Sequence, residues 1–218
     1  ALLATTLMLP NNRVTPSTGS AFPFAQVFKI PGFVVFLFAA GCVQSSHGVY
    51  YAFSTLDWRA AGLDDSVIGL LWAEGVIAEI VLFAAAARIM RRLGPEQLIL
   101  LGGLAGLLRW SVLPVTDWLP ILIVVQVLHA FTFGAAHLGA IHFMARAVPQ
   151  QLSATAQSLY AAAVMGIATG GSMFLAGTLY ESFSGYAYFA MAALGAIGAA
   201  CALAMPRVTG YAGEPNAR

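Results

Sequence analysis

The chain has 218 residues, of which 60% are hydrophobic and only 9% are charged. An ordinary soluble domain carries about 25% charged residues, so this composition excludes disorder, a disulfide-rich secreted module and almost every soluble enzyme. The formal net charge of +1 gives no reason to expect nucleic acid as a partner. Cys42 and Cys201 lie in apolar runs, so neither a disulfide framework nor a metal site is expected. Length and apolarity together indicate an all-helical, polytopic membrane protein.

The first thirty residues differ from the remainder of the chain. Residues 1–9 are apolar but too short to span a bilayer, and we interpret them as the end of a preceding transmembrane helix. Residues 10–30 contain several Pro, Ser and Thr together with Arg13 and Lys29, a composition typical of a cytoplasmic linker between two halves. We therefore expect this chain to be the C-terminal part of a longer protein.

The region 31–206 contains six apolar stretches, each close to the length that a spanning helix needs. Their apolar residues run continuously instead of alternating, which argues against strands. Breakers and charges are concentrated in the short connections between them. The six expected helices are 31–55, 66–90, 97–114, 119–144, 152–180 and 185–205.

The charges in the connections alternate along the chain. One set of segments carries the basic residues Arg13, Lys29, Arg88, Arg91, Arg92, Arg146, Arg207 and Arg218. The other set carries Asp57, Asp64, Asp65, Asp117 and Glu181, with Arg59 as the single basic residue. Because basic residues remain on the cytoplasmic side, we expect the linker and the tail 207–218 to be cytoplasmic and the protein to lie in the inner (plasma) membrane.

Two of the expected helices carry charges deep in the hydrocarbon layer, where charge is costly and usually functional. Glu79 in helix 66–90 and Arg109 in helix 97–114 each lie about 16 Å from the cytoplasmic helix end, at 1.5 Å per residue. The two residues are therefore level on neighbouring helices, and we expect them to pair. Glu74 lies farther out in the same helix as Glu79.

Polar stripes along two further helices predict a water-accessible cavity between them. Gln126, His129, Phe133 and His137 lie within about 80° of one another at 100° per residue. Helix 31–55 carries a similar stripe made of Gln44, His47, Tyr51 and Ser54. Helix 152–180 contributes a smaller patch, Gln157 and Tyr160. We expect these residues to line the substrate cavity.

Five segments, in order, resemble the C-terminal half of a known transporter group. They are SHGVYYAFS (46–54), LWAEGVIAE (71–79), LRW (108–110), VVQVLHAFTF (124–133) with His137-Leu138 beyond, and AQSLY (156–160). Together they are similar to major facilitator superfamily permeases of the phenylpropionate-permease type, distant relatives of lactose permease and nucleoside–proton symporters. The resemblance covers approximately Lys29 to Arg207.

The resemblance implies a fold and roles for residues. Members have twelve helices in two halves, each built from two inverted three-helix repeats. Half of such a transporter is therefore expected here, and its N-terminal six-helix half is expected as a partner. The resemblance also implies that Glu79, Arg109 and His129 bind the proton or couple it to substrate, and it gives Glu74 a lower rank. Arg91-Arg92-Leu93-Gly94 resembles the superfamily's basic loop motif but lacks its Asp.

The function expected from these observations is secondary active transport of a small organic solute by alternating access, coupled to protons as symport. A drug–proton antiporter is the alternative within the class. Two other classes stay open: a membrane subunit that does not transport, and a membrane protein that binds haem through His47 and His129. No enzymatic activity, metal or cofactor is expected.

Overall fold

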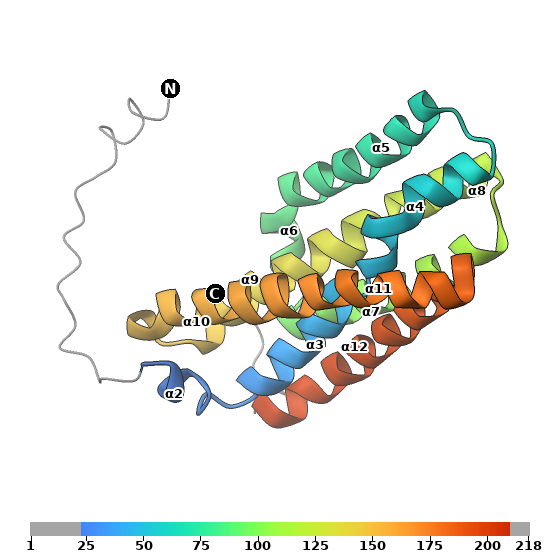
Figure 1. The fold of residues 1–218 in the computed structure, drawn as a ribbon. Coiled ribbons are helices and arrows are strands. Elements are labelled where there is room, and N and C mark those ends of the chain that lie inside the picture. The colour runs from blue at the N-terminus through green and yellow to red at the C-terminus, as the bar shows by residue number, and fades with distance from the viewer. Residues whose placement is uncertain (1–22, 210–218) are drawn as a thin grey trace, which may run out of the picture.

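The computed structural model describes residues 23–209, and within that range its regular structure is helical (Figure 1). Residues 1–9, interpreted above as the end of a preceding helix, and residues 210–218 of the tail lie outside the described range. The predicted linker ends in a five-residue helix, α2 (Pro23–Val27). The longer helices are α3 (Phe33–Ser45), α4 (Gly48–Ala60), α5 (Asp65–Ala84), α7 (Pro95–Val112), α8 (Leu119–Val127), α9 (Ala136–Ala147), α10 (Ser153–Tyr160), α11 (Thr169–Phe183) and α12 (Tyr188–Thr209).

Five continuous helical stretches in the described residues are long and apolar enough to cross a membrane. They are Phe33–Ala60, Asp65–Ala84, Pro95–Val115, Leu119–Ala147 and Gln150–Met205. The last has 56 residues, about 84 Å of helix at 1.5 Å per residue. It reverses at the short turn η5 (Ser184–Ala187), where Ser184 has φ 51°, so the chain changes direction between α11 and α12 (Figure 1). The six predicted stretches therefore correspond to six helical segments.

The first stretch extends five residues beyond its predicted end and is broken between α3 and α4 at Ser46 and His47. The Ser46 hydroxyl donates a hydrogen bond to the Val43 carbonyl (2.6 Å), and the His47 amide turns to the Gln44 carbonyl (3.2 Å). Hydroxyls that bond back to the preceding turn bend helices. The break separates α3 from α4 within this stretch.

Two other stretches contain π-helical segments that hydropathy does not predict. The fourth carries η2 (Ala130–Ala135) between α8 and α9, and the fifth carries η4 (Ala161–Ala168) between α10 and α11. A π segment inserts an extra residue into a turn and occurs frequently at functional sites. In the fifth stretch the Thr169 hydroxyl donates to the Val164 carbonyl (2.9 Å).

Close helix packing at small residues forms the centre of the bundle. α12 packs along α7 and α3. A Cβ atom built on Gly103 of α7 would lie 2.7 Å from backbone atoms of Gly195 and Ala199 in α12, so only glycine fits there. A Cβ atom built on Gly102, in the GxxxG pair of α7, would lie 2.9 Å from the Ala136 side chain. Gly170, in the corresponding pair of α11, has no atom within 4 Å of such a Cβ.

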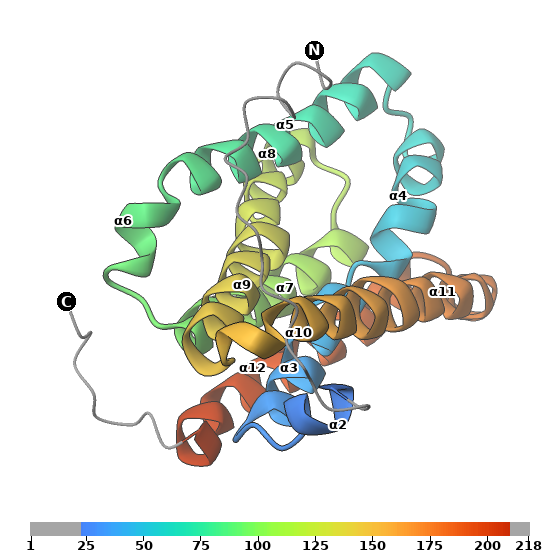
Figure 2. The same ribbon diagram turned by 90° about the vertical axis from the view of Figure 1, so that its left-hand side faces the viewer.

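The second stretch lies at the edge of the bundle. Only 22% of the apolar window of α5 is buried inside the chain. α5 and the short α6 (Ala86–Met90) lie along one side of the bundle, apart from α11 and α12 (Figure 2). Large side chains on α5, such as Leu70, Ile80 and Val81, are exposed. Such an apolar outer surface is what a bilayer or a second helical domain would cover.

Candidate functional site

The centre of the site is Arg109 of α7, whose side chain has no exposed surface. Its guanidinium donates from Nη1 to the Thr132 hydroxyl (3.2 Å) and to His129 Nδ1 (3.1 Å), and from Nη2 to Gln126 Oε1. The guanidinium carbon also lies over the rings of Tyr50 (4.3 Å) and Trp110 (4.6 Å). Polar acceptors and aromatic faces on three helical stretches therefore hold this cation in place.

The hydrogen-bond directions assign the tautomer of His129. Because arginine can only donate, His129 Nδ1 must accept, and the proton of the neutral ring lies on Nε2. Nε2 faces the Glu79 carboxylate at 3.7 Å. The side chain of Glu79 is 18% exposed, whereas that of His129 is 8% exposed. Arg109, His129 and Glu79 thus form a series that leads from the buried cation to a carboxylate at the open face.

The predicted direct pair of Glu79 and Arg109 is wrong in its geometry. The two residues lie near the same cluster, but the imidazole of His129 lies between the two charged groups. Within the described residues, Arg59 forms an ion pair with Asp65, whereas Glu79 faces Nε2 of the neutral His129 ring. Sequence spacing along two helices fixes depth, but it cannot show which side chain of a third helix reaches between them.

A second series connects the same arginine to α3 and α4. The carbonyl of Gln44 can only accept, so His47 Nδ1 carries its proton (3.0 Å). His47 Nε2 then accepts from the Thr132 hydroxyl (3.0 Å), which in turn accepts from Arg109. Both ring nitrogens of His47 are therefore occupied. This leaves neither for iron and disfavours the haem interpretation.

Local backbone features bring these side chains together. The break before α4 places His47 and Tyr50 against α7, and the segment η2 carries Thr132 on the turn after His129. Glycines allow α5 to approach: a Cβ on Gly75 would meet the His129 side chain at 3.4 Å, and one on Gly134 would meet the Glu79 side chain at 3.3 Å. Small residues at these points let the α5 carboxylate reach the imidazole.

A series of rings continues from His129 along the same face. His129 and Phe133 stack with centroids 5.7 Å apart, and Phe133 and His137 with centroids 6.0 Å apart. His137 Nδ1 lies 3.2 Å from the Tyr160 hydroxyl. Tyr51 stacks on His47 (5.2 Å). Phe133, His137 and Tyr51 are partly exposed, so this predicted face offers flat apolar surface next to polar atoms.

Four predicted or considered residues lie differently from the expectation. Gln126 is fully buried. Its amide accepts a hydrogen bond from Arg109 and donates to the Tyr50 hydroxyl and the Leu71 carbonyl. Ser54 is buried with no hydrogen-bond partner, and Gln157 bonds to Ser153 on its own helix (3.1 Å). Glu74 lines an apolar groove beside Leu70 and Ile123, away from the arginine cluster.

Sequence reasoning missed three members of the cluster: Thr132, Tyr50 and Trp110. Trp110 donates to the Ser46 hydroxyl (2.9 Å) and covers one face of Arg109. A threonine three residues after His129 was a usable signal, because that spacing shares a helix face. Tyr50 is indistinguishable by pattern from an ordinary packed tyrosine, and only the contact with Arg109 reveals it.

A bundle of long apolar helices around a buried, hydrogen-bonded charge cluster defines a multi-pass membrane protein. The chain belongs to the MFS_1-like family of transporters, whose sequence profile matches residues 4–191. This is a family of transporters and not of enzymes.

Two curated relatives are similar to the chain. It is 36% identical over 162 residues to the probable 3-phenylpropionic acid transporter of Escherichia coli K12, covering 74% of this chain and 42% of that protein. It is 25% identical over 192 residues to the uncharacterized transporter YwbF of Bacillus subtilis 168, covering 87% of this chain and 47% of that protein. The chain thus spans less than half the length of either relative. No solved structure matches the chain significantly.

Proposed function

We propose that this chain is the C-terminal half of a proton-coupled secondary transporter, a symporter that carries a small organic solute by alternating access. In this proposal six helices span the inner membrane as two inverted three-helix repeats. The linker and the C-terminal tail face the cytoplasm. An N-terminal half of the same design covers the polar face. The family, the relatives' length and the alternating loop charges support this arrangement.

The observation that carries the proposal is the series Arg109, His129, Glu79. A carboxylate within a membrane bundle is costly, and here it lies next to a histidine that is hydrogen-bonded to a buried cation. Glu79 is the member of the series nearest the open face, so it can exchange a proton with water in the cavity. Arg109 holds His129 in the tautomer that presents Nε2–H to Glu79. Protonation of Glu79 would weaken that contact, which offers a route from proton binding to movement of α5 against η2.

The substrate class that fits best is an aromatic carboxylate. The name of the Escherichia coli relative describes such a substrate for that protein. In this chain the partly exposed rings of Tyr51 and Phe133 offer a stacking surface for an aromatic ring. His137 and the Tyr160 hydroxyl lie beside it as polar groups that could meet a carboxylate.

Uptake by the full-length protein tests this function. Cells or proteoliposomes would be supplied with a panel of labelled aromatic acids, nucleosides and sugars, with an inward proton gradient and then with a protonophore. The proposal predicts that an aromatic acid accumulates and that the protonophore abolishes accumulation. Accumulation that persists in the presence of the protonophore would contradict proton coupling. Uptake of only a nucleoside or a sugar would contradict the substrate class.

A further inference from the structure

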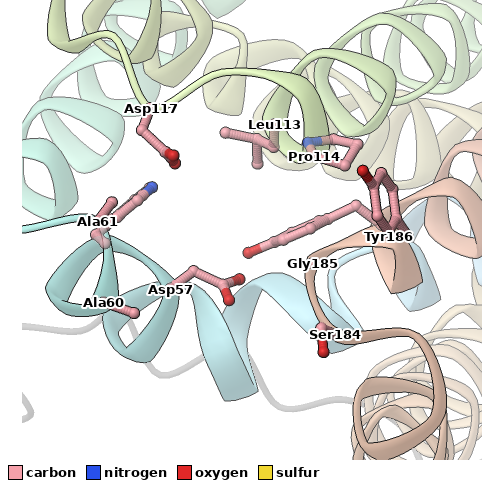
Figure 3. Close-up of a pocket in the computed structure, with 11 residues that line it drawn as sticks. Asp57, Ala60, Ala61, Leu113, Pro114, Asp117, Ser184, Gly185 and Tyr186 are labelled. Atoms are coloured by element: carbon pink, nitrogen blue, oxygen red, sulfur yellow. The ribbon is translucent and has the colours of Figure 1, made fainter.

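A cavity separate from the arginine cluster lies where three segments of the bundle end. Its volume is about 380 Å³, within the range of pockets that hold small organic ligands. The end of α4, the connection after α7 and the turn η5 form its walls (Figure 3). None of the residues assigned above to the central site lines it. The lining residues that matter here are Asp57, Trp58, Asp117, Tyr186 and Tyr188.

The cavity has an uncompensated negative lining. The carboxylates of Asp57 and Asp117 project into the same space, and no Lys or Arg lines it (Figure 3). One oxygen of Asp57 accepts a hydrogen bond from the Tyr180 hydroxyl. Its other oxygen, Oδ2, is buried and accepts no hydrogen bond of normal geometry, although the Tyr188 hydroxyl lies near the carboxylate. A buried acceptor without a well-placed donor is costly, so a ligand that brings a further hydrogen-bond donor, above all a positively charged one, would stabilise this carboxylate.

The remaining walls select the kind of cation. The rings of Trp58 and Tyr188 are each only 3% exposed and so form fixed walls, while Tyr186 lies at the exposed mouth. Aromatic faces attract organic cations, and Leu113 and Pro114 add apolar surface. Calcium and magnesium ions take six or more oxygen ligands, water molecules included. The described residues contain no group of three or more His, Cys, Asp or Glu side chains that could supply a metal site.

We propose that this cavity binds a small organic cation, an alkyl- or arylammonium, with its ammonium group between Asp57 and Asp117 and its apolar part against the rings. A bound ammonium would donate to the unpaired oxygen of Asp57 and offset the repulsion between the two carboxylates. It would also hold the ends of α4, α7 and α11 together. Its charge is opposite to that of the substrate proposed for the central site, so the two sites are separable by experiment.

Thermal unfolding of the purified full-length protein would test this site, with 2-phenylethylammonium as the probe and 3-phenylpropionate as the probe of opposite charge. We expect a saturable rise in Tm with 2-phenylethylammonium. Asp57→Asn and Asp117→Asn should each weaken its apparent affinity about tenfold or more, because each removes one charged acceptor. Asp64→Asn is the matched control: it removes a carboxylate from a neighbouring loop that does not line the cavity, and it should leave the affinity unchanged.

Asp117 is exposed, so Asp117→Asn keeps the test decisive even if Asp57→Asn fails to fold. The absence of a Tm rise, or an equal rise in wild type and Asp117→Asn, would overturn the proposal. A rise with magnesium chloride in place of the ammonium would overturn the ligand class. The ligand class would also be overturned if 3-phenylpropionate raised the Tm and if Asp57→Asn and Asp117→Asn weakened its apparent affinity equally. Failure of aromatic acid transport would leave each of these outcomes unaffected.

Discussion

The residues that hold Arg109 in place also form hydrogen bonds with other parts of the protein. Gln126 shows this most clearly, because its amide accepts from the guanidinium and donates to the Tyr50 hydroxyl (3.0 Å) and to the Leu71 carbonyl (2.9 Å). Because its polar atoms are so occupied and it has no exposed surface, we expect Gln126 to position the arginine and not to contact substrate directly. The polar stripe on its helix predicted that Gln126 lines the substrate cavity. It could not show that the hydrogen-bond partners of Gln126 are other residues of the same chain.

We expect Gln126→Leu to destabilise the protein by about 2 kcal/mol or more. The substitution removes the acceptor for Nη2 of the buried guanidinium and the side-chain donor to the Leu71 carbonyl, and each buried polar group left unpaired costs about 1–3 kcal/mol. Gln157→Leu is the matched control, because Gln157 is exposed and bonds only to Ser153. It should change stability by no more than about 0.5 kcal/mol. Thermal unfolding measures both, and equal effects would contradict the role assigned to Gln126.

Thr132 connects Arg109 to His47 through a single hydroxyl. Thr132→Val keeps the shape of the side chain, but it removes the donor to His47 and the acceptor for Arg109. We expect the initial rate of uptake by the full-length protein to fall about tenfold or more, because both hydrogen bonds of this hydroxyl are lost and about 1.4 kcal/mol corresponds to a factor of ten. Thr132→Ser keeps the hydroxyl and should retain most of the rate. Equal initial rates for Thr132→Val and Thr132→Ser would contradict a role of the Thr132 hydroxyl in transport.

At the scale of the helices, hydropathy predicted where the chain is helical but not where helices deviate. The six stretches were found because a spanning helix needs a long apolar run. The break before α4 and the π segments η2 and η4 were missed, because hydropathy does not distinguish a bent or π-helical turn from a regular α-helical one. These deviations nevertheless decide which side chains meet: the break precedes Tyr50, and η2 carries Thr132 and Phe133.

Contact between α4 and α11 makes Gly48 sensitive to substitution. A Cβ there would lie 2.5 Å from the Ser172 hydroxyl and 2.9 Å from its backbone. We therefore expect Gly48→Ala to destabilise the protein by about 1–3 kcal/mol through overpacking. Gly170→Ala, on α11 itself, meets nothing within 4 Å and should be neutral or stabilising by up to about 1 kcal/mol. Thermal unfolding that ranks the two variants in the opposite order would contradict this packing.

At the scale of the whole molecule, the polar face and the short match to longer relatives have one explanation. Partly exposed Glu79, Tyr51 and His137 lie on a face that six helices alone leave uncovered. The chain spans 42% and 47% of its two curated relatives. We infer that a second domain covers this face in the complete transporter. Neither composition nor periodicity could predict its position, because those signals describe one helix at a time.

The loop charges make a prediction about the arrangement of the complete protein in the membrane. Single cysteines at Asp64 and at Pro149, introduced into an otherwise cysteine-free protein, should react with a membrane-impermeant reagent from opposite sides. The position of Asp64 should be labelled from outside the cell, because basic residues are retained in the cytoplasm. Labelling of both positions from the same side would contradict the six-span topology.

The central claim is that Glu79 carries the coupled proton, and transport by Glu79→Gln in the full-length protein tests it most directly. The amide keeps the size of the side chain but cannot bind and release a proton. Glu74→Gln is the matched control, because Glu74 lies five residues away on the same helix, in an apolar groove outside the arginine cluster. We predict that Glu79→Gln abolishes accumulation against a gradient while exchange down a gradient continues, and that Glu74→Gln accumulates substrate normally. Uphill accumulation at the normal rate by Glu79→Gln would contradict the account.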